Sequence, residues 1–421
     1  MKEEYAVQIW REMEREGMEE LFFCHDPSSG LKAVVAIHNT ALGPALGGCR
    51  CWTYASEEEA VRDAVKLAKG MTYKNAMAGL PYGGGKAVVW NVVGDSEQMT
   101  TGERIGEVLI VEPAKGNIID AALKDPAKGG TLGVTPVDAS LDGTLDQVQA
   151  DPAKNEEIRA SQFRALGRFL ERLHGRFVTG LDLGTTAADM DQIRVETAYV
   201  TDTTGSLGAQ DDFTADMTAY GVYTGIVTSL RHQGVADLQG IPVAVQGLGK
   251  VGYALCRYLH AAGARLIVAD VVPERVQRAL VQFSGAISAD PARIHAADCK
   301  VFAPCALGGV ITPATVEELR CSIVAGAANN QLSERQLVAG RMQARGILYA
   351  PDYVLSAGGI ISTACELQGA GPDLIRQKVA GIAGTLSKVF AEAAQSGIFT
   401  ADAADRLAEV ILESGQTDPT Q

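Results

Sequence analysis

The chain has 421 residues and a formal net charge of −14, with 47% hydrophobic and 21% charged residues. This balance is typical of a globular protein of two or three domains. The negative charge argues against nucleic acid or an anionic membrane as a partner. No apolar run approaches the ~20 residues that span a bilayer.

The charged start of the chain, Met1 to Glu4, is followed by no apolar stretch, so we expect no signal peptide and a cytoplasmic protein. Eight cysteines are scattered along the chain. Cys49 and Cys51 form a close pair, but no second pair or histidine cluster accompanies them. This pattern predicts reduced thiols and no metal site.

The first half of the chain mixes strand and helix patterns. We predict a strand over 31–38 and a helix over 56–69, where Ser56 caps the helix and acidic residues fill the first turn. A short buried strand is predicted over 86–90, and an amphipathic helix over 156–174.

Residues 91–150 differ from the rest of the chain. They contain no Phe, Tyr or Trp and hold ten acidic and four basic residues. Three related tetrapeptides recur in or beside this region, but their uneven spacing argues against a solenoid repeat. A surface insertion is the simplest interpretation, and a small subdomain with a thin core is the alternative.

The second half alternates strands and helices. A helix is predicted over 251–262, and strands over 241–246, 265–270, 300–303, 322–325 and 347–350. Alternation of this kind predicts a parallel, doubly wound sheet. The stretch 374–413 is predicted to be helical.

A Gly-x-Gly-x-x-Gly run follows the strand predicted over 241–246. Its glycines are Gly247, Gly249 and Gly252, and Lys250 and Val251 lie between them. Such a turn brings a pyrophosphate close to the N-terminus of the next helix. The alternative is a glycine turn that binds nothing.

Asp270 ends the next predicted strand, near the ~20-residue spacing of dinucleotide-binding folds. Its carboxylate can accept hydrogen bonds from both ribose hydroxyls and would repel a 2′-phosphate. The next four residues supply no cation. The sequence therefore favours NAD over NADP.

Two lysines stand on backbone rich in small residues: Lys74, and Lys86, which follows three glycines. A desolvated lysine has a lowered pKa and can act as a base, whereas a charged one can hold a carboxylate. Two solvated surface lysines are the alternative, which the adjacent glycines disfavour. Asp182, at a predicted strand end, would suit a lysine partner or a helix cap.

These motifs occur in an order that closely resembles the leucine, phenylalanine and valine dehydrogenases of the glutamate dehydrogenase superfamily. The resemblance covers nearly the whole chain outside 91–150. The matching segments are Gly-Pro-Ala-Leu-Gly-Gly (43–48), Met-Thr-Tyr-Lys-Asn (71–75), Gly-Gly-Gly-Lys (83–86), Asp-Leu-Gly-Thr (182–185), the glycine turn (247–252), Ala-Pro-Cys-Ala-Leu-Gly-Gly (303–309), Ala-Ala-Asn-Asn-Gln (327–331) and Ala-Pro-Asp-Tyr-Val (350–354).

The resemblance implies NAD-dependent, reversible oxidative deamination of an L-amino acid to a 2-oxo acid and ammonia. It implies a substrate-binding and oligomerisation domain over 1–201, which would carry the insertion 91–150. A Rossmann-type NAD-binding domain would span 202–390, and a C-terminal helix in 391–421 would pack back on the first domain. A cleft would separate the two domains, and the protein would form a homo-oligomer.

The resemblance also assigns roles to residues. Lys74 would hold the substrate carboxylate, Lys86 would be the general base that activates water, and Asp182 would move a proton to and from the amino group. Gly47 and Gly48 would line the site. The side-chain pocket would be formed by Leu46, Met71, Gly180, Ile360 and Thr363. The cofactor or substrate would also contact Thr218, Cys305, Ala306, Asn329 and Asn330.

The implied side-chain pocket contains no cation, so glutamate is expected to be a poor substrate. One methylene is worth only ~1–3 kcal/mol in such a pocket, so the pattern does not separate valine, leucine and phenylalanine. The bulk of Ile360 favours a branched aliphatic substrate.

Two positions depart from the family pattern: Ser356 where Asn is usual, and Asp216 where Pro is common. The alternative function is an inactive or regulatory NAD-binding homologue that binds a partner through the acidic region 91–150. A hydroxy-acid dehydrogenase is a third reading, but the histidine and arginine expected of one are not evident.

Overall fold

A computed structural model describes residues 9–91, 152–210 and 212–416. These residues form two β-sheets with helices packed on them, which confirms the predicted α/β class. Both sheets belong to one compact unit, formed by Met1–Gly94 and Glu156–Gln421. The predicted insertion 91–150 lies outside the described residues, except for Asn91.

The first sheet is mixed. Its strand order is β1 (Glu20–Asp26), β2 (Leu31–Asn39), β4 (Gly83–Trp90), β3 (Ala45–Trp52) and β5 (Phe177–Leu181). The pairs β1–β2 and β2–β4 are antiparallel, whereas β3 runs parallel to both β4 and β5. One face packs on α3 (Pro152–Glu171) and α4 (Ala187–Arg194), and the other packs on α2 (Glu57–Met77). A short helix, α1 (Ile9–Glu16), precedes the sheet.

Helix α2 is longer than predicted. Ser56 caps it by accepting the backbone N–H of Glu59, and the helix continues through Gly70 to Met77. A glycine inside a helix costs about 1 kcal/mol relative to alanine. Burial of Thr72, Asn75 and neighbouring residues on the last turns offsets that cost.

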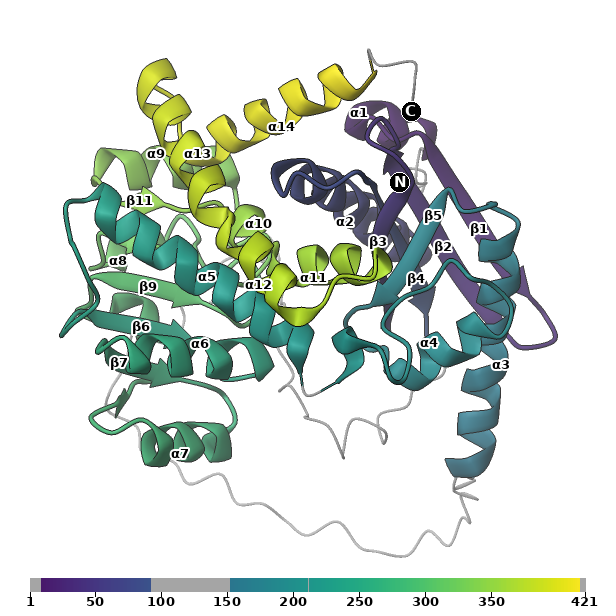
Figure 1. Ribbon diagram of the computed structural model, residues 1–421, viewed down its shortest axis with the longest axis horizontal. Helices are drawn as coiled ribbons and strands as arrows, with labels where there is room; N and C mark the ends of the chain where they lie inside the picture. The colour runs from purple at the N-terminus through teal and green to yellow at the C-terminus, as the bar shows by residue number, and fades with distance from the viewer. Residues whose placement is uncertain (1–8, 92–151, 211, 417–421) are drawn as a thin grey trace, which may run out of the picture. The chain divides into compact units, whose positions relative to one another are not determined.

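The second sheet is parallel throughout, as the alternating pattern predicts. Its strand order is β11 (Leu348–Tyr349), β10 (Ile323–Val324), β9 (Val301–Pro304), β6 (Pro242–Gln246), β7 (Arg265–Ala269) and β8 (Ile287–Ser288). Helices α5 (Phe213–His232) and α6 (Lys250–Ala261) cover one face (Figure 1). Helices α8 (Thr315–Glu318) and α9 (Arg335–Ala344) cover the other.

Further short helices lie before, between and after the strands of this sheet. They are η3 (Leu207–Ala209), α7 (Pro273–Gln282), η4 (Ile294–Ala296), α10 (Asp352–Leu355) and α11 (Gly358–Leu367). The helical stretch predicted over 374–413 is divided into α12 (Pro372–Ala380), α13 (Ile382–Ser396) and α14 (Thr400–Gln416).

Helix α14 packs against α2, far away in the sequence. The hydroxyl of Tyr73 on α2 donates to Glu409 on α14 at 3.0 Å. Gly397 ends α13 in the left-handed conformation, with φ 66°, which lets the chain turn into α14. Within the described residues, no helix has the length and apolar character needed to cross a membrane.

Candidate active site

A cavity of about 350 Å³ lies where strand ends and loops of both sheets meet. Most of the predicted site residues line it, although they come from segments far apart in the chain. Those that line the cavity are Leu46, Gly47, Gly48, Met71, Lys74, Lys86, Gly180, Asp182, Thr218, Val251, Cys305, Ala306, Asn329, Ile360 and Thr363.

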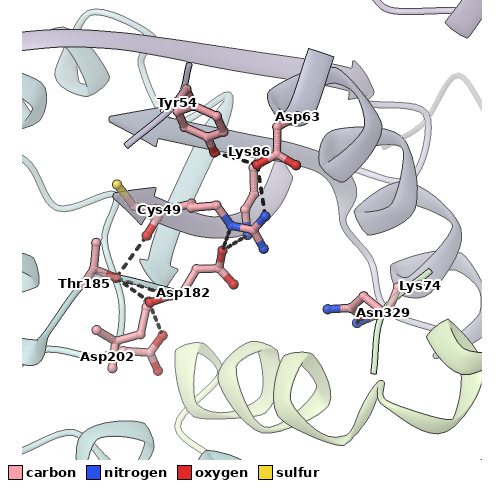
Figure 2. A network of polar contacts seen from close by, with 11 residues as sticks. Cys49, Tyr54, Asp63, Lys74, Lys86, Asp182, Thr185, Asp202 and Asn329 are labelled. Atoms are coloured by element: carbon pink, nitrogen blue, oxygen red, sulfur yellow. Dashed lines mark hydrogen bonds and ion pairs between the residues drawn. The ribbon is translucent and has the colours of Figure 1, made fainter. Parts of the chain in front are cut away.

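Lys86 and Asp182 form an ion pair in this cavity, with 2.9 Å between Lys86 Nζ and Asp182 Oδ2 (Figure 2). The lysine side chain is only 4% exposed and that of Asp182 is 25% exposed. Lys86 lies in β4, and Asp182 directly follows β5. Strand β3 lies between β4 and β5, and the two charged groups meet across it.

Gly48 on β3 makes this ion pair possible. A Cβ atom at Gly48 would lie 2.8 Å from the Asp182 Cβ and 3.2 Å from Lys86 Nζ. Any side chain there would push the two charged groups away from β3. The glycine-rich sequence around the lysines therefore has a structural reason, close packing around Lys86.

Arg50 is a second cation on Asp182. Its Nε donates to Asp182 Oδ2 at 2.9 Å, and its Nη1 donates to Asp63 at 3.0 Å. The hydroxyl of Tyr54 donates to the same Asp63 oxygen at 2.5 Å (Figure 2). Burial alone would raise the pKa of Asp182, but Lys86 and Arg50 outweigh burial and lower it to about 2.

Sequence reasoning missed Arg50, although a signal was present. Arg50 lies two residues after Gly48 on β3, and residues two apart share one face of a strand. A position on the same face as a predicted site glycine therefore pointed toward the site.

Lys74 lies on the last turn of α2, and its Nζ is 3.5 Å from Asn329 Oδ1. Burial lowers its pKa to about 8; the nearby Asp352 carboxylate opposes this shift, and the charge of Lys86 adds to it. The next residue, Asn75, was not predicted as a site residue. Its amide donates to the carbonyls of Leu46 and Gly83 and so ties α2 to β3 and β4.

The glycine turn follows β6 and opens α6, as predicted. Gly247 has a φ of 93°, which a side chain would strain. Gly249 precedes the first turn of α6, no side chain caps that turn, and nothing lies within 4 Å of a Cβ at Gly249. The first N–H groups of α6 are therefore open to an anion.

Asp270 follows β7 and is tied to this turn. It accepts the backbone N–H of Leu248 at 2.6 Å and that of Val272 at 2.9 Å. The four residues after Asp270 supply no cation, but the fifth, Arg275, lies 3.5 Å from the Asp270 carboxylate. A cation therefore stands beside the carboxylate that was expected to have none close by.

Some predicted cofactor residues do not line the cavity: Gly247, Gly249, Lys250, Gly252, Asp270 and Asn330. Lys250 is 73% exposed and pairs with Asp212 at 2.8 Å. Cys305 does line the cavity, and burial raises the pKa of its thiol to about 12, which opposes a role as a nucleophile. No group of three or more His, Cys, Asp or Glu side chains in the described ranges is arranged to hold a metal ion.

The cavity also holds residues that were not predicted: Leu181, Asp202, Ala327, Ala328, Ser356 and Gly359. Ser356, which departs from the family pattern, has a buried hydroxyl that makes no hydrogen bond. Asp202 adds a buried carboxyl group next to Gly180, one of the residues predicted to form the side-chain pocket. Sequence reasoning missed it because its contact with Gly180 is tertiary.

Asp216, the other departure, has a structural explanation. It lies in the first turn of α5 and accepts from Arg257 at 2.6 Å, Tyr258 at 2.8 Å and Arg376 at 3.3 Å. This cluster joins α5, α6 and α12 and does not line the cavity.

Comparisons with known proteins show which family the chain resembles. Residues 19–108 match the profile of the Glu/Leu/Phe/Val dehydrogenase dimerisation domain, and residues 274–403 match that of the glutamate/leucine/phenylalanine/valine dehydrogenases. The chain is 43% identical to a leucine dehydrogenase of Thermoactinomyces intermedius, over 97% of this chain and 94% of the relative. It is 39% identical to a valine dehydrogenase of Streptomyces albus, over 93% and 92%.

Among solved structures, that of an L-tryptophan dehydrogenase from Nostoc punctiforme has a TM-score of 0.71 and 35% sequence identity. The match covers 97% of this chain and all of that one. The parallel second sheet has the arrangement found in dinucleotide-binding folds, and the matched family profiles place the protein in the class of oxidoreductases. The chain belongs to the Glu/Leu/Phe/Val dehydrogenase family and is an amino acid dehydrogenase of the leucine, valine and tryptophan branch.

Proposed function

We propose that the protein catalyses the reversible oxidative deamination of an L-amino acid with a mainly apolar side chain of about leucine or valine size, using NAD. The observation that carries this proposal is the 2.9 Å ion pair of Lys86 and Asp182, in a cavity that Lys74 also lines. The similarity of the chain to a leucine dehydrogenase and a valine dehydrogenase supports the same substrate size.

NAD fits the residues around the glycine turn. The uncapped first turn of α6 would receive the pyrophosphate, and Asp270 would accept the ribose hydroxyls. The negative charge of Asp270 supports NAD over NADP, although Arg275 lies beside it. When bound, the nicotinamide ring accepts a hydride from the substrate Cα.

The protein's own residues would bind and orient the substrate and move its protons. Lys74 would hold the α-carboxylate, while Asp182 would accept a proton from the amino group. After oxidation to the iminium, Lys86 in its uncharged form would take a proton from the attacking water. Ammonia then leaves, and the 2-oxo acid is the product. The Lys86–Asp182 pair would carry the transferred protons.

The side-chain pocket supports an apolar substrate because Leu46, Met71 and Ile360 line it. Among the described residues, the lysines and arginines that line the cavity are Lys74 and Lys86, and both are assigned to the reacting end. A glutamate side chain would therefore place an unpaired carboxylate in the pocket, at a cost of several kcal/mol.

The test is NADH formation at 340 nm with a panel of L-amino acids at alkaline pH. We expect activity with leucine or valine and little with glutamate. Silence across the panel would contradict the proposal and favour a regulatory NAD-binding protein. Lys86→Ala should abolish turnover and leave NAD binding, measured by calorimetry, within about twofold; turnover that survives this change would contradict the assigned base.

The matched profile of a dimerisation domain supports a homo-oligomer. The boundaries 1–201 and 202–390 remain predictions, as does a role for residues 91–150.

A further inference from the structure

Asp202 is the least expected residue in the cavity. It is only 5% exposed, and its backbone is in the left-handed region, with φ 56°. A non-glycine residue in this conformation is strained, and it persists only where the surrounding structure holds it. Here the preceding backbone pairs with β5: the N–H of Thr201 donates to the carbonyl of Thr179 at 2.8 Å, and the N–H of Thr179 donates to the carbonyl of Tyr199 at 3.1 Å.

The two oxygens of the Asp202 carboxyl group have different surroundings. Oδ2 accepts the backbone N–H of Leu181 at 3.0 Å and the hydroxyl of Thr201 at 3.1 Å. Oδ1 is buried and has no hydrogen-bond partner. A buried carboxyl oxygen without a partner is costly, so this oxygen is a position where a ligand group would be stabilising.

Two glycines make room for this carboxyl group. A Cβ atom at Gly180 would lie 2.3 Å from Asp202 Oδ2, and one at Gly208 would lie 2.2 Å from Oδ1. Gly180 on β5 lies opposite Gly48 on β3, and Gly48 in turn contacts the Lys86–Asp182 pair. Any larger residue at either glycine would displace it.

The loop that carries Gly208 is held in place by Glu366. This carboxylate accepts the backbone N–H groups of Leu207 at 2.6 Å and Gly208 at 3.1 Å. Burial raises the pKa of Asp202, and the charge of Glu366 adds to this effect, although the N–H of Leu181 and the hydroxyl of Thr201 oppose it. Whatever its protonation state, the carboxyl oxygen Oδ1 can accept a hydrogen bond.

We infer that Asp202 determines specificity at the side-chain end of the cavity and selects L-amino acids with an apolar body and a hydrogen-bond-donating terminus, such as a hydroxyl. This inference rests on the proposed function and narrows its substrate class. Leu46, Met71 and Ile360 contact the body of the side chain, and Asp202 Oδ1 pairs with its terminus. An all-aliphatic side chain of the same size leaves that oxygen unpaired.

The test compares two amino acids of equal size, L-homoserine and L-norvaline, which differ by a terminal hydroxyl in place of a methyl. We expect the intact enzyme to favour homoserine in kcat/KM by about 10-fold or more, because a site that hydrogen-bonds a hydroxyl rejects the analogue that lacks it. In Asp202→Gly, which is compatible with the left-handed backbone, we expect this ratio to fall by about 10-fold or more.

Two further variants distinguish the effect of the Asp202 carboxyl group from the effect of relaxing a left-handed backbone. Asp202→Asn keeps the shape and can still hydrogen-bond, so it should retain part of the homoserine preference. Glu334→Gly relaxes another left-handed acidic residue, which is exposed and does not line the cavity, and it should leave the ratio unchanged. An equal homoserine-to-norvaline ratio in the intact enzyme and Asp202→Gly would overturn the inference.

The outcome is distinguishable from failure of the proposed function. If no amino acid yields NADH, the reaction is wrong, and calorimetric binding of homoserine and norvaline to the NADH-loaded protein still tests Asp202. A homoserine preference in binding that disappears in Asp202→Gly supports the inference, and equal binding in both proteins overturns it.

Discussion

Asp182 pairs with two cationic side chains, Lys86 and Arg50. Of the two, only Lys86 has an expected role in proton transfer. Arg50 donates to the same Asp182 oxygen that Lys86 contacts, and Arg50 is itself held by Asp63. We therefore regard Arg50 as a positioning residue. It keeps Asp182 ionised and oriented while Lys86 exchanges protons.

Replacing Arg50 tests this role. Arg50→Gln should raise the pKa of Asp182 above about 2, because one of the two cations that lower it is removed. We expect kcat to fall by up to about 100-fold through misplacement of Asp182. The acidic limb of the pH–rate profile should also move to higher pH. A fall in kcat with an unmoved acidic limb would indicate a purely structural role, and Arg50→Lys should restore part of the activity.

Lys74 predicts a pH effect on binding. Its pKa is lowered to about 8, so the free enzyme loses this positive charge as the pH rises through 8. A carboxylate ligand that needs the charge should bind about 10-fold more weakly for each pH unit above that value. The measurement is the inhibition constant of a 2-hydroxy acid analogue between pH 7 and 10. Lys74→Arg should flatten the profile, and an equally steep profile in that variant would exclude Lys74 as its cause.

At the scale of elements, the β6–α6 turn and the end of β7 decide the choice of cofactor. Asp270 bonds the backbone of the turn, and Arg275 stands beside it on α7. Asp270→Ser removes the charge that repels a 2′-phosphate and keeps the nearby cation. We expect kcat/KM for NADP to rise by about 10-fold or more. The double variant with Arg275→Gln should lose this gain; if it does not, Arg275 takes no part in cofactor selection.

His38 joins three elements and predicts acid sensitivity. This buried residue of β2 bonds Thr72 on α2 at 2.8 Å and the carbonyl of Glu16 on α1 at 3.1 Å. Burial lowers its pKa from 6.5 to about 4, so below pH 6.5 the unfolded chain binds a proton that the folded chain excludes. Folding stability should therefore fall by roughly 2 kcal/mol between pH 7 and pH 5.

The measurement is the urea midpoint of the intact protein and of His38→Gln at both pH values. The variant should be less stable at pH 7 and lose less stability on acidification. An equal loss in both proteins would show that His38 is not the group responsible.

The C-terminal end of helix α2 shows the limit of prediction from local sequence. The helix predicted over 56–69 ends just before Gly70, whereas α2 continues to Met77. The helix continues because its last turns pack on the first sheet, where a Cβ at Gly84 would lie 2.1 Å from the Thr72 backbone nitrogen. Packing of that kind overrides helix propensity and is invisible in a window of a few residues.

At the scale of the whole molecule, strand β1 forms one edge of the first sheet and exposes Phe23, whose exposed fraction is 56%. An edge strand with an exposed aromatic residue is suited to contact with a second chain. Residues 19–108, which include β1, match a dimerisation domain. We expect the protein to be a homo-oligomer in solution.

Phe23→Lys should raise the dissociation constant of that assembly by about 10-fold or more. The change removes the aromatic contact that Phe23 is expected to make with the second chain. Light scattering across a concentration series measures the change. The matched control is Val281→Lys on α7, which is also exposed but lies outside the matched dimerisation domain. A monomeric intact protein, or equal assembly in both variants, would contradict this interface.

The sequence by itself determined the parallel second sheet, the glycine turn with Asp270, and the two lysines with Asp182. The first two depend on residue types at short, regular spacings, and the third depends on the small residues beside the lysines and on the family resemblance. Only the tertiary structure decided that Arg50 shares Asp182 with Lys86, that Arg275 stands beside Asp270, and that Asp202 enters the cavity through the space at Gly180 and Gly208. Those contacts join side chains to groups that local pattern does not pair, and close packing of strands, helices and loops brings them together.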